Sequence, residues 1–173
     1  ADALGRRDAG AQLNARMRAQ FSEIAAQVGN RENPRLAFIE WIDPPMSGGH
    51  WMPELILIAG GINLFGAHGA QSPWISLEDV VAADPDIILV APCGYGIAKT
   101  QSEMSVLDTN PRWQGLRAVR SGQLFVADGN AFFNRPGPRL VESAQILAEI
   151  LHPEVADYGH IEKNVVRHRA IAS

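Results

Sequence analysis

The chain of 173 residues carries 19 acidic and 15 basic side chains, which gives a net charge of −4. This length suits one α/β domain with an adequate core or one lobe of a larger protein, and the scattered arginines give no indication of a nucleic-acid partner. No apolar run approaches the roughly 18 to 20 residues that a membrane span needs, and residues 55–59 are far too short.

The single cysteine and the first residues limit the class of protein only loosely. Cys93 alone excludes an internal disulfide framework and leaves the redox compartment open. The chain opens on Ala1 without methionine and shows no basic-then-apolar leader with a small-residue cleavage site. We therefore expect a chain that was processed, or cut from a longer protein.

A long helix is predicted for residues 4–28. Apolar side chains recur at spacings of four, four, three and four, which places them on one helical stripe: Leu13, Met17, Phe21, Ile24 and Val28. Gly29 follows as a stop signal. At about 1.5 Å per residue the helix would be roughly 40 Å long, the scale of a whole domain. Such a length favours a spine between two lobes.

Strands and helices alternate after this spine. The expected strands are residues 35–42, 87–91 and 123–127, and the expected helices are residues 53–59, 97–107 and 138–151. A further short helix is capped by Ser76, with Asp79 completing a capping box. The apolar run at residues 87–91 is typical of a central parallel strand. The alternation predicts an α/β fold, a three-layer sandwich with a mainly parallel sheet, preceded by the long inter-lobe spine helix.

The predicted elements divide the chain into three parts. Residues 1–29 form the spine helix, residues 30–152 form the α/β lobe, and residues 153–173 form a polar, weakly periodic tail that we expect to be partly disordered. Three histidines in or near this tail are expected to be solvated: His152, His160 and His168.

Aromatic and proline-stiffened loops follow the expected strands. Parallel strands end at one edge of a sheet, where open α/β sheets bind their ligands, so these loops should meet there. The expected surface is a flat apolar wall with two polar anchors: Trp74, Tyr95, Phe132 and Met46, with Asn130 and Arg135. Such a wall suits a large, flat, semi-polar ligand. The alternative is that each aromatic side chain fills the core or a loop.

Two loop residues could carry chemistry. His50 is a candidate ligand of a metal or metal-bearing cofactor, but no H-x-x-x-H or H-E-x-x-H spacing supports it, and a loop hydrogen bond is the simpler expectation. Cys93 follows a buried strand, as a nucleophile can, but no histidine or acid is obviously placed to activate it. We therefore expect no catalytic residue and no resident metal or cofactor.

Five segments occur in an order that resembles a known family. They are residues 43–46, 59–65, 72–80, 83–90 and 132–140. Together they resemble the C-terminal lobe of class III periplasmic binding proteins, and within that group the cobalamin-binding component of ABC importers. The resemblance covers residues 1–152, with the opening helix in the place of the inter-lobe spine. It implies a second lobe before residue 1, and a location in the periplasm or at the outer face of the cytoplasmic membrane.

The resemblance also implies roles for single residues. Trp74 matches an aromatic side chain that packs on the corrin ligand, and Met46 falls where the family can carry a phenylalanine. Arg135 matches an arginine near the ligand, while Ala131 stands where the family has an aspartate. Glu78 matches a surface glutamate that docks into arginines of the membrane permease, although its sequence context alone indicates an acid favoured by the helix dipole.

The leading hypothesis is a solute-binding protein of an ABC importer, or its C-terminal lobe. It would bind a corrinoid such as cobalamin without covalent chemistry and deliver it to the permease. Within this class the alternative is an iron-siderophore or haem binder, with Arg135 and Lys99 as basic anchors. From a different class, a small α/β enzyme using Cys93 stays open.

Overall fold

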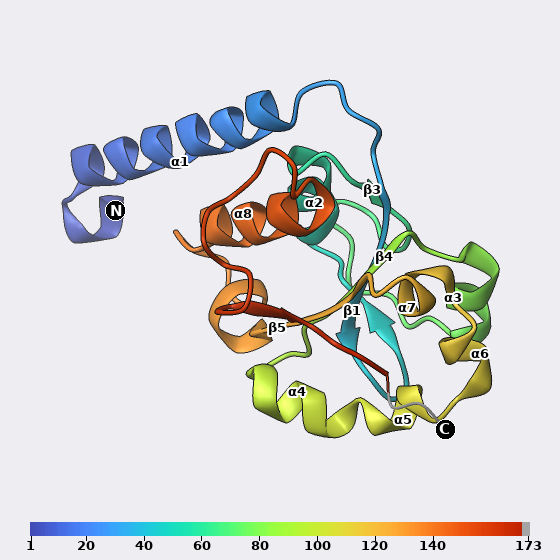
Figure 1. Ribbon diagram of the computed structural model, residues 1–173. Coiled ribbons are helices and arrows are strands. Elements are labelled where there is room, and N and C mark those ends of the chain that lie inside the picture. Colours follow the sequence, from blue (N-terminus) through green and yellow to red (C-terminus); the bar gives the residue numbers. More distant parts are fainter. Residues whose placement is uncertain (171–173) are drawn as a thin grey trace.

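A mixed sheet lies between two layers of helices in the computed structural model, which describes residues 1–170 (Figure 1). The strand order is β2-β1-β4-β5-β6, and β3 also pairs with β1. The strands are β1 (Arg35–Trp41), β2 (Met46–Ser47), β3 (Ile62–Asn63), β4 (Ile87–Val90), β5 (Leu124–Ala127) and β6 (Val165–Arg167). β1 pairs in parallel with β3 and β4, and β4 with β5, whereas β2 and β6 are antiparallel. The predicted α/β class with a mainly parallel sheet is confirmed.

The central strand β4 shows why its sequence is apolar without interruption. Ile87 and Leu89 pack in the core on one face of the sheet, and Ile88 and Val90 pack in the core on the other. Successive side chains of a strand point to opposite faces, so a strand covered on both faces needs apolar residues at every position.

Helices cover both faces of the sheet. One core packs against α2 (Met52–Ile58) and α8 (Leu140–Leu151). The other core packs against a series of short helices: α3 (Leu77–Ala83), α4 (Ile97–Glu103), α5 (Ser105–Asp108), α6 (Pro111–Gln114) and α7 (Arg117–Arg120). The sequence predicted one helix over residues 97–107, but the structure divides it at Met104. The N–H of this buried residue is shared between the carbonyls of Thr100 and Gln101.

The predicted spine is the long helix α1 (Arg7–Val28). It begins at Arg7 rather than at residue 4, because Gly5, at φ 61°, ends a preceding 3-10 turn, η1 (Asp2–Leu4). α1 contacts α8 and α2, and Figure 1 shows its amino-terminal half extending past the body of the lobe. Of the predicted apolar stripe of α1, only the carboxyl-terminal residues Ile24 and Val28 are fully buried.

The polar tail is an ordered part of the fold over residues 153–170, and the expectation of disorder was wrong for this range. β6 adds to the sheet beside β5, with Val166 opposite Val126. The expected solvation of the three histidines was also wrong. His152 and His160 are buried, and Nε2 of His168 lies 2.7 Å from Oδ2 of the buried Asp108.

One buried acid holds the tail against α8. The carboxyl group of Glu149, with 2% of the residue exposed, accepts backbone N–H groups of Tyr158, His160 and Ile161, the last at 3.1 Å. Backbone donors that are buried or partly buried need an acceptor, and Glu149 supplies one for the buried N–H of His160 and for the partly buried N–H groups of Tyr158 and Ile161. Residues that sequence reasoning assigned to a loose tail therefore belong to the core.

Candidate functional site

The loops after β4 and β5 meet at the carboxyl edge of the sheet. The N–H of Asn130 donates to the carbonyl of Tyr95 at 3.1 Å, joining the two loops. This close approach depends on Gly129, because a Cβ there would lie 2.3 Å from the carbonyl oxygen of Pro92. Asn130 and its neighbours belong to a short π-helical turn, η2 (Gly129–Phe133), which Asp128 caps by accepting the N–H of Ala131 at 2.8 Å.

Two pairs of apolar side chains lie at this edge. Trp74 is 63% exposed, and its backbone forms an isolated antiparallel bridge with Met46 in β2. Tyr95 is partly exposed and packs against Trp41 at the end of β1, with ring centroids 5.4 Å apart. Nζ of Lys99 lies 5.4 Å from the centroid of the Tyr95 ring. Sequence reasoning missed Trp41, although its place at the carboxyl end of β1 was the available signal.

The two expected polar anchors line one hollow. Asn130 and Arg135 border an open hollow of about 530 Å³, together with Pro136, Pro138 and Arg139. Arg135 is exposed, and within residues 1–170 it has no hydrogen-bond or ion-pair partner. A guanidinium group without an acid beside it is free to meet polar or anionic groups of a ligand.

Phe132 does not belong to the exposed surface, and the expectation for its side chain is corrected. It is 8% exposed and lies in the core under α8. Its ring makes an edge contact with His160 at 6.1 Å and lies 5.7 Å from the Arg139 guanidinium carbon. The tail supplies His160, so the burial of Phe132 depends on a segment that the sequence did not place against it.

His50 lies at the same edge but is held by its backbone. Its N–H donates to the carbonyl of Ala70 at 2.7 Å, and its φ of 53° is positive. The imidazole is exposed, and its ring centroid lies 5.9 Å from that of Trp51. In the described part of the chain no three His, Cys, Asp or Glu side chains are grouped so that they could hold a metal ion.

A partly buried polar cluster lies behind these surface residues. Oε2 of Glu40, in β1, accepts the Ser72 hydroxyl at 3.0 Å, and Oε1 lies 3.2 Å from the Cys93 sulfur. The Ser72 hydroxyl oxygen in turn accepts the N–H of Gly49 at 3.1 Å. On the other side, Oδ1 of Asn134 lies 3.5 Å from the Cys93 sulfur. Sequence reasoning assigned no role to Glu40, Ser72 or Asn134.

The chemistry of Cys93 follows from this cluster. Burial, then the hydrogen bond to Glu40 and its negative charge, raise the pKa of the Cys93 thiol from its ordinary value to about 12. Nucleophilic catalysis needs the thiolate, which a pKa this high disfavours near neutral pH. The geometry therefore makes Cys93 a hydrogen-bond donor rather than an activated nucleophile.

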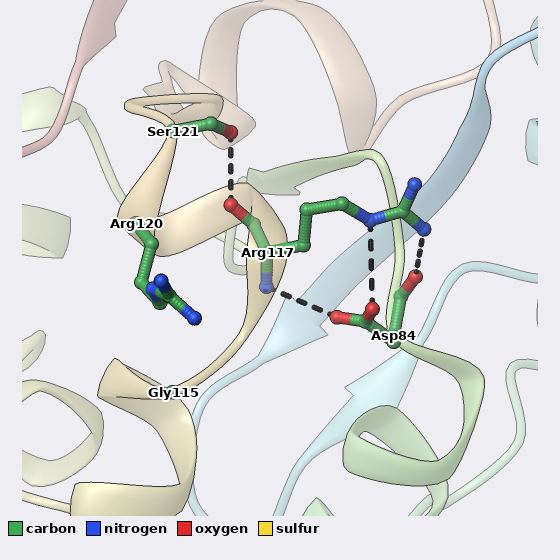
Figure 2. Close-up of a pocket in the computed structure, with 5 residues that line it drawn as sticks. All are labelled: Asp84, Gly115, Arg117, Arg120 and Ser121. Carbon is green, nitrogen blue, oxygen red and sulfur yellow. Dashed lines mark hydrogen bonds and ion pairs between the residues drawn. The ribbon is translucent and has the colours of Figure 1, made fainter.

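A second hollow, of about 510 Å³, lies on the side of the lobe where β4 begins, and Figure 2 shows the residues that line it. There Arg117 makes an ion pair with Asp84 (Nε to Oδ2, 3.4 Å) and another with Asp86 (Nη1 to Oδ1, 2.7 Å). Arg120 also lines this hollow, but open α/β sheets bind ligands at the carboxyl ends of their strands, and this hollow lies at the opposite end of β4. The carboxyl edge is therefore the candidate ligand site.

Glu78 lies apart from this site, on the exposed first turn of α3. The predicted capping box is present: the Ser76 hydroxyl oxygen accepts the N–H of Asp79 at 3.1 Å, and Oδ2 of Asp79 accepts the N–H of Ser76 at 2.8 Å. Oε1 of Glu78 pairs with Nη1 of Arg112 at 2.6 Å, and both side chains are more than half exposed. An exposed pair of this kind adds little stability, so Glu78 is available to another charged partner.

Comparison with known proteins finds relatives in sequence and in fold. A family profile described as "Periplasmic binding protein" matches residues 1–131. The vitamin B12-binding protein of Vibrio cholerae is 27% identical over 101 residues, which cover 58% of this chain and 33% of that protein.

Two solved structures share the fold. A substrate-binding protein of an ABC transporter from Listeria monocytogenes matches with a TM-score of 0.76 at 19% identity, covering 86% of this chain and 59% of that one. A periplasmic heme-binding protein from Pseudomonas aeruginosa matches with a TM-score of 0.72 at 23% identity, covering 99% of this chain and 62% of that one.

The fold is that of an α/β lobe of the solute-binding class. The chain belongs to the periplasmic binding protein family, and the resemblance noted from its sequence is confirmed. It spans about a third of the curated relative and about three fifths of the two solved chains. Across residues 1–170 no helix has the length and apolar character required to cross a membrane.

Proposed function

We propose that this chain forms the C-terminal lobe of the solute-binding protein of an ABC importer, and that it binds a corrinoid such as cobalamin. The observation that carries the proposal is the exposed Trp74 beside Met46, at the edge where Tyr95 and the unpaired Arg135 also lie. The name of the Vibrio cholerae relative supports the ligand. A second lobe would supply the rest of the cleft.

Binding would need no covalent chemistry. The face of Trp74 would cover an apolar ring system, because large aromatic surfaces gain free energy when they are removed from water. Asn130 and Arg135 would orient the polar side chains of the ligand from the neighbouring hollow. The protonated thiol of Cys93 favours this function over an enzyme with a cysteine nucleophile.

A haem or a ferric siderophore is the second candidate for the ligand. Arg135 is unpaired and Arg139 borders the same hollow, so anionic groups could be held there. Lys99 adds less to this alternative, because its ammonium group already pairs with Glu103.

One titration series separates the ligands. The full-length protein is titrated calorimetrically with cyanocobalamin, haemin and a ferric hydroxamate siderophore, each in separate runs. The proposal expects stoichiometric binding of cyanocobalamin that is tighter than binding of the other two. A preference for haemin or the siderophore would keep the solute-binding function and replace the ligand, and binding of none of them would contradict the corrinoid assignment.

We further propose that Glu78 docks on an ABC permease in the membrane. Glu78→Arg should abolish uptake while leaving the affinity for cyanocobalamin unchanged, because the side chain lies on α3, away from the candidate site, and pairs with the exposed Arg112. Glu32→Arg is the matched control, since Glu32 is also an exposed acid but precedes β1. Uptake by Glu78→Arg at the wild-type rate would refute the docking role.

A further inference from the structure

A chain of hydrogen bonds joins the four loops that carry the candidate site. The N–H of Gly49 donates to the Ser72 hydroxyl oxygen, and the Ser72 hydroxyl and the Cys93 thiol both donate to Glu40. Asn134 joins this network through its Nδ2, which donates to the carbonyl of Pro92 beside Cys93. These loops also hold His50, Trp74, Tyr95 and Arg135. Glu40 lies at the centre, since each of its carboxyl oxygens meets a donor from a different loop.

We propose that Glu40 is a positioning residue of the ligand site, and that it holds the four loops in one arrangement through the Ser72 hydroxyl and the Cys93 thiol. The part of this inference that concerns ligand binding rests on the proposed function. The arrangement of the loops itself does not depend on which ligand binds. When the loops of a site are already fixed, ligand binding does not have to order them, and the free-energy cost of binding is lower.

The bonds of Glu40 point to the site rather than to general stability. Glu40 is only partly buried, and within residues 1–170 no basic side chain forms an ion pair with it. Its two side-chain partners, Ser72 and Cys93, both belong to loops at the carboxyl edge. Asn134 extends the connection by donating from Nδ2 to the carbonyl of Pro92 at 3.1 Å, which ties the loop after β5 to the loop after β4.

The protonation of Cys93 fits this role. Because the pKa of the thiol is raised to about 12, the sulfur keeps its proton near neutral pH and can donate it to the Glu40 carboxyl group. A serine hydroxyl can donate in the same place, whereas an alanine side chain cannot. The pair Cys93→Ser and Cys93→Ala therefore separates loss of the hydrogen bond from loss of the side chain.

The first experiment measures backbone amide hydrogen exchange in the full-length protein without ligand. Glu40→Ala should raise exchange together in the loops at residues 46–50, 70–75, 92–96 and 129–136, while amides of β4 and α8 stay protected. Asp86→Asn is the control, because Asp86 is a hydrogen-bonded acid at the opposite end of β1, where it accepts the backbone N–H of Arg35 at 2.8 Å. Faster exchange in one loop only, or in none, would overturn the proposal.

If Glu40→Ala does not fold, Ser72→Ala removes one arm of the same connection. It should raise exchange at residues 46–50 and 70–75, because the Gly49 amide loses its acceptor. Unchanged protection at the Gly49 amide in this variant would also overturn the proposal.

The second experiment measures the affinity for cyanocobalamin. Cys93→Ala should weaken binding by roughly five- to tenfold, the scale of one lost hydrogen bond, and Cys93→Ser should stay within about threefold of the wild type. Equal affinities of the alanine and serine variants would contradict the role of the donor. If the wild type does not bind cyanocobalamin, the corrinoid assignment fails, and the exchange experiment still decides whether Glu40 holds the loops.

Discussion

Two glutamates of this lobe hold loops in place, and their surroundings differ. Glu149 in α8 is 2% exposed and accepts backbone N–H groups from three residues of one tail segment. Glu40 at the end of β1 is partly exposed and accepts side-chain donors from two different loops. The first contact is saturated and buried, as expected of a structural acceptor. The second lies directly behind a surface with exposed aromatic side chains, as expected of a group that shapes a binding site.

The difference shows how the same side chain can serve the fold or the site. Backbone donors of a buried segment cannot find water, so their acceptor contributes mainly to folding. Hydroxyl and thiol donors at an open edge can turn to water when the acceptor is removed, so the cost to folding is smaller there. The effect should then fall on the positions of the loops.

The largest effect is expected from Glu149→Ala. One buried and two part-buried N–H groups would lose their acceptor, which should lower the free energy of unfolding by roughly 3 kcal/mol, as measured by urea denaturation. Glu142→Gln, on the same helix with its side chain 44% exposed, is the control and should change it by less than about 0.5 kcal/mol. Similar values for the two variants would show that Glu149 is not a structural acceptor.

The reactivity of Cys93 tests the chemistry behind Glu40. With a pKa near 12 the thiol should be alkylated by iodoacetamide at pH 8 on the order of a hundredfold more slowly than an unhindered cysteine thiol. Alkylation in urea, where the chain is unfolded, gives the reference rate in the same sample. Rapid modification of the folded protein would instead indicate an activated thiol and revive the enzyme alternative.

Trp74→Ala probes the exposed surface of the candidate ligand site. Removing the indole should weaken the binding of cyanocobalamin by roughly 1 to 3 kcal/mol, the scale for burying a large aromatic surface. The stability of the free protein should hardly change, because the side chain is 63% exposed. Leu57→Ala, at a position that is 70% exposed on α2, serves as the control. An unchanged affinity would remove Trp74 from the site.

The last effect is expected only at alkaline pH. The pKa of Cys93 is higher in the folded protein than its ordinary value of 9.0, so the folded state favours the protonated thiol. This contribution to stability is complete below pH 9 and is lost as the pH rises toward 12. The unfolding free energy of the wild type should therefore fall relative to that of Cys93→Ser over this range. Parallel pH profiles would contradict the raised pKa.

Sequence patterns were reliable where a few neighbouring residues decide the structure. The capping box of Ser76 and Asp79 was recognised correctly because it depends on hydrogen bonds between near neighbours. The apolar run of β4 was recognised correctly because successive side chains of one strand point to opposite faces of the sheet, and both faces are covered. The glycine stop after α1 was recognised for the same reason. The order of five short segments was enough to indicate the family, which the comparisons confirm.

The tertiary structure decided which residues from distant parts of the chain come into contact. Phe132 is buried because His160 and α8 cover it, and the tail is ordered because Glu149 accepts its backbone. Glu40 and Cys93 meet across 53 positions of sequence at the ends of two neighbouring parallel strands. Composition and periodicity report which face of an element is apolar, but they do not report which polar groups the folded chain brings within hydrogen-bond distance.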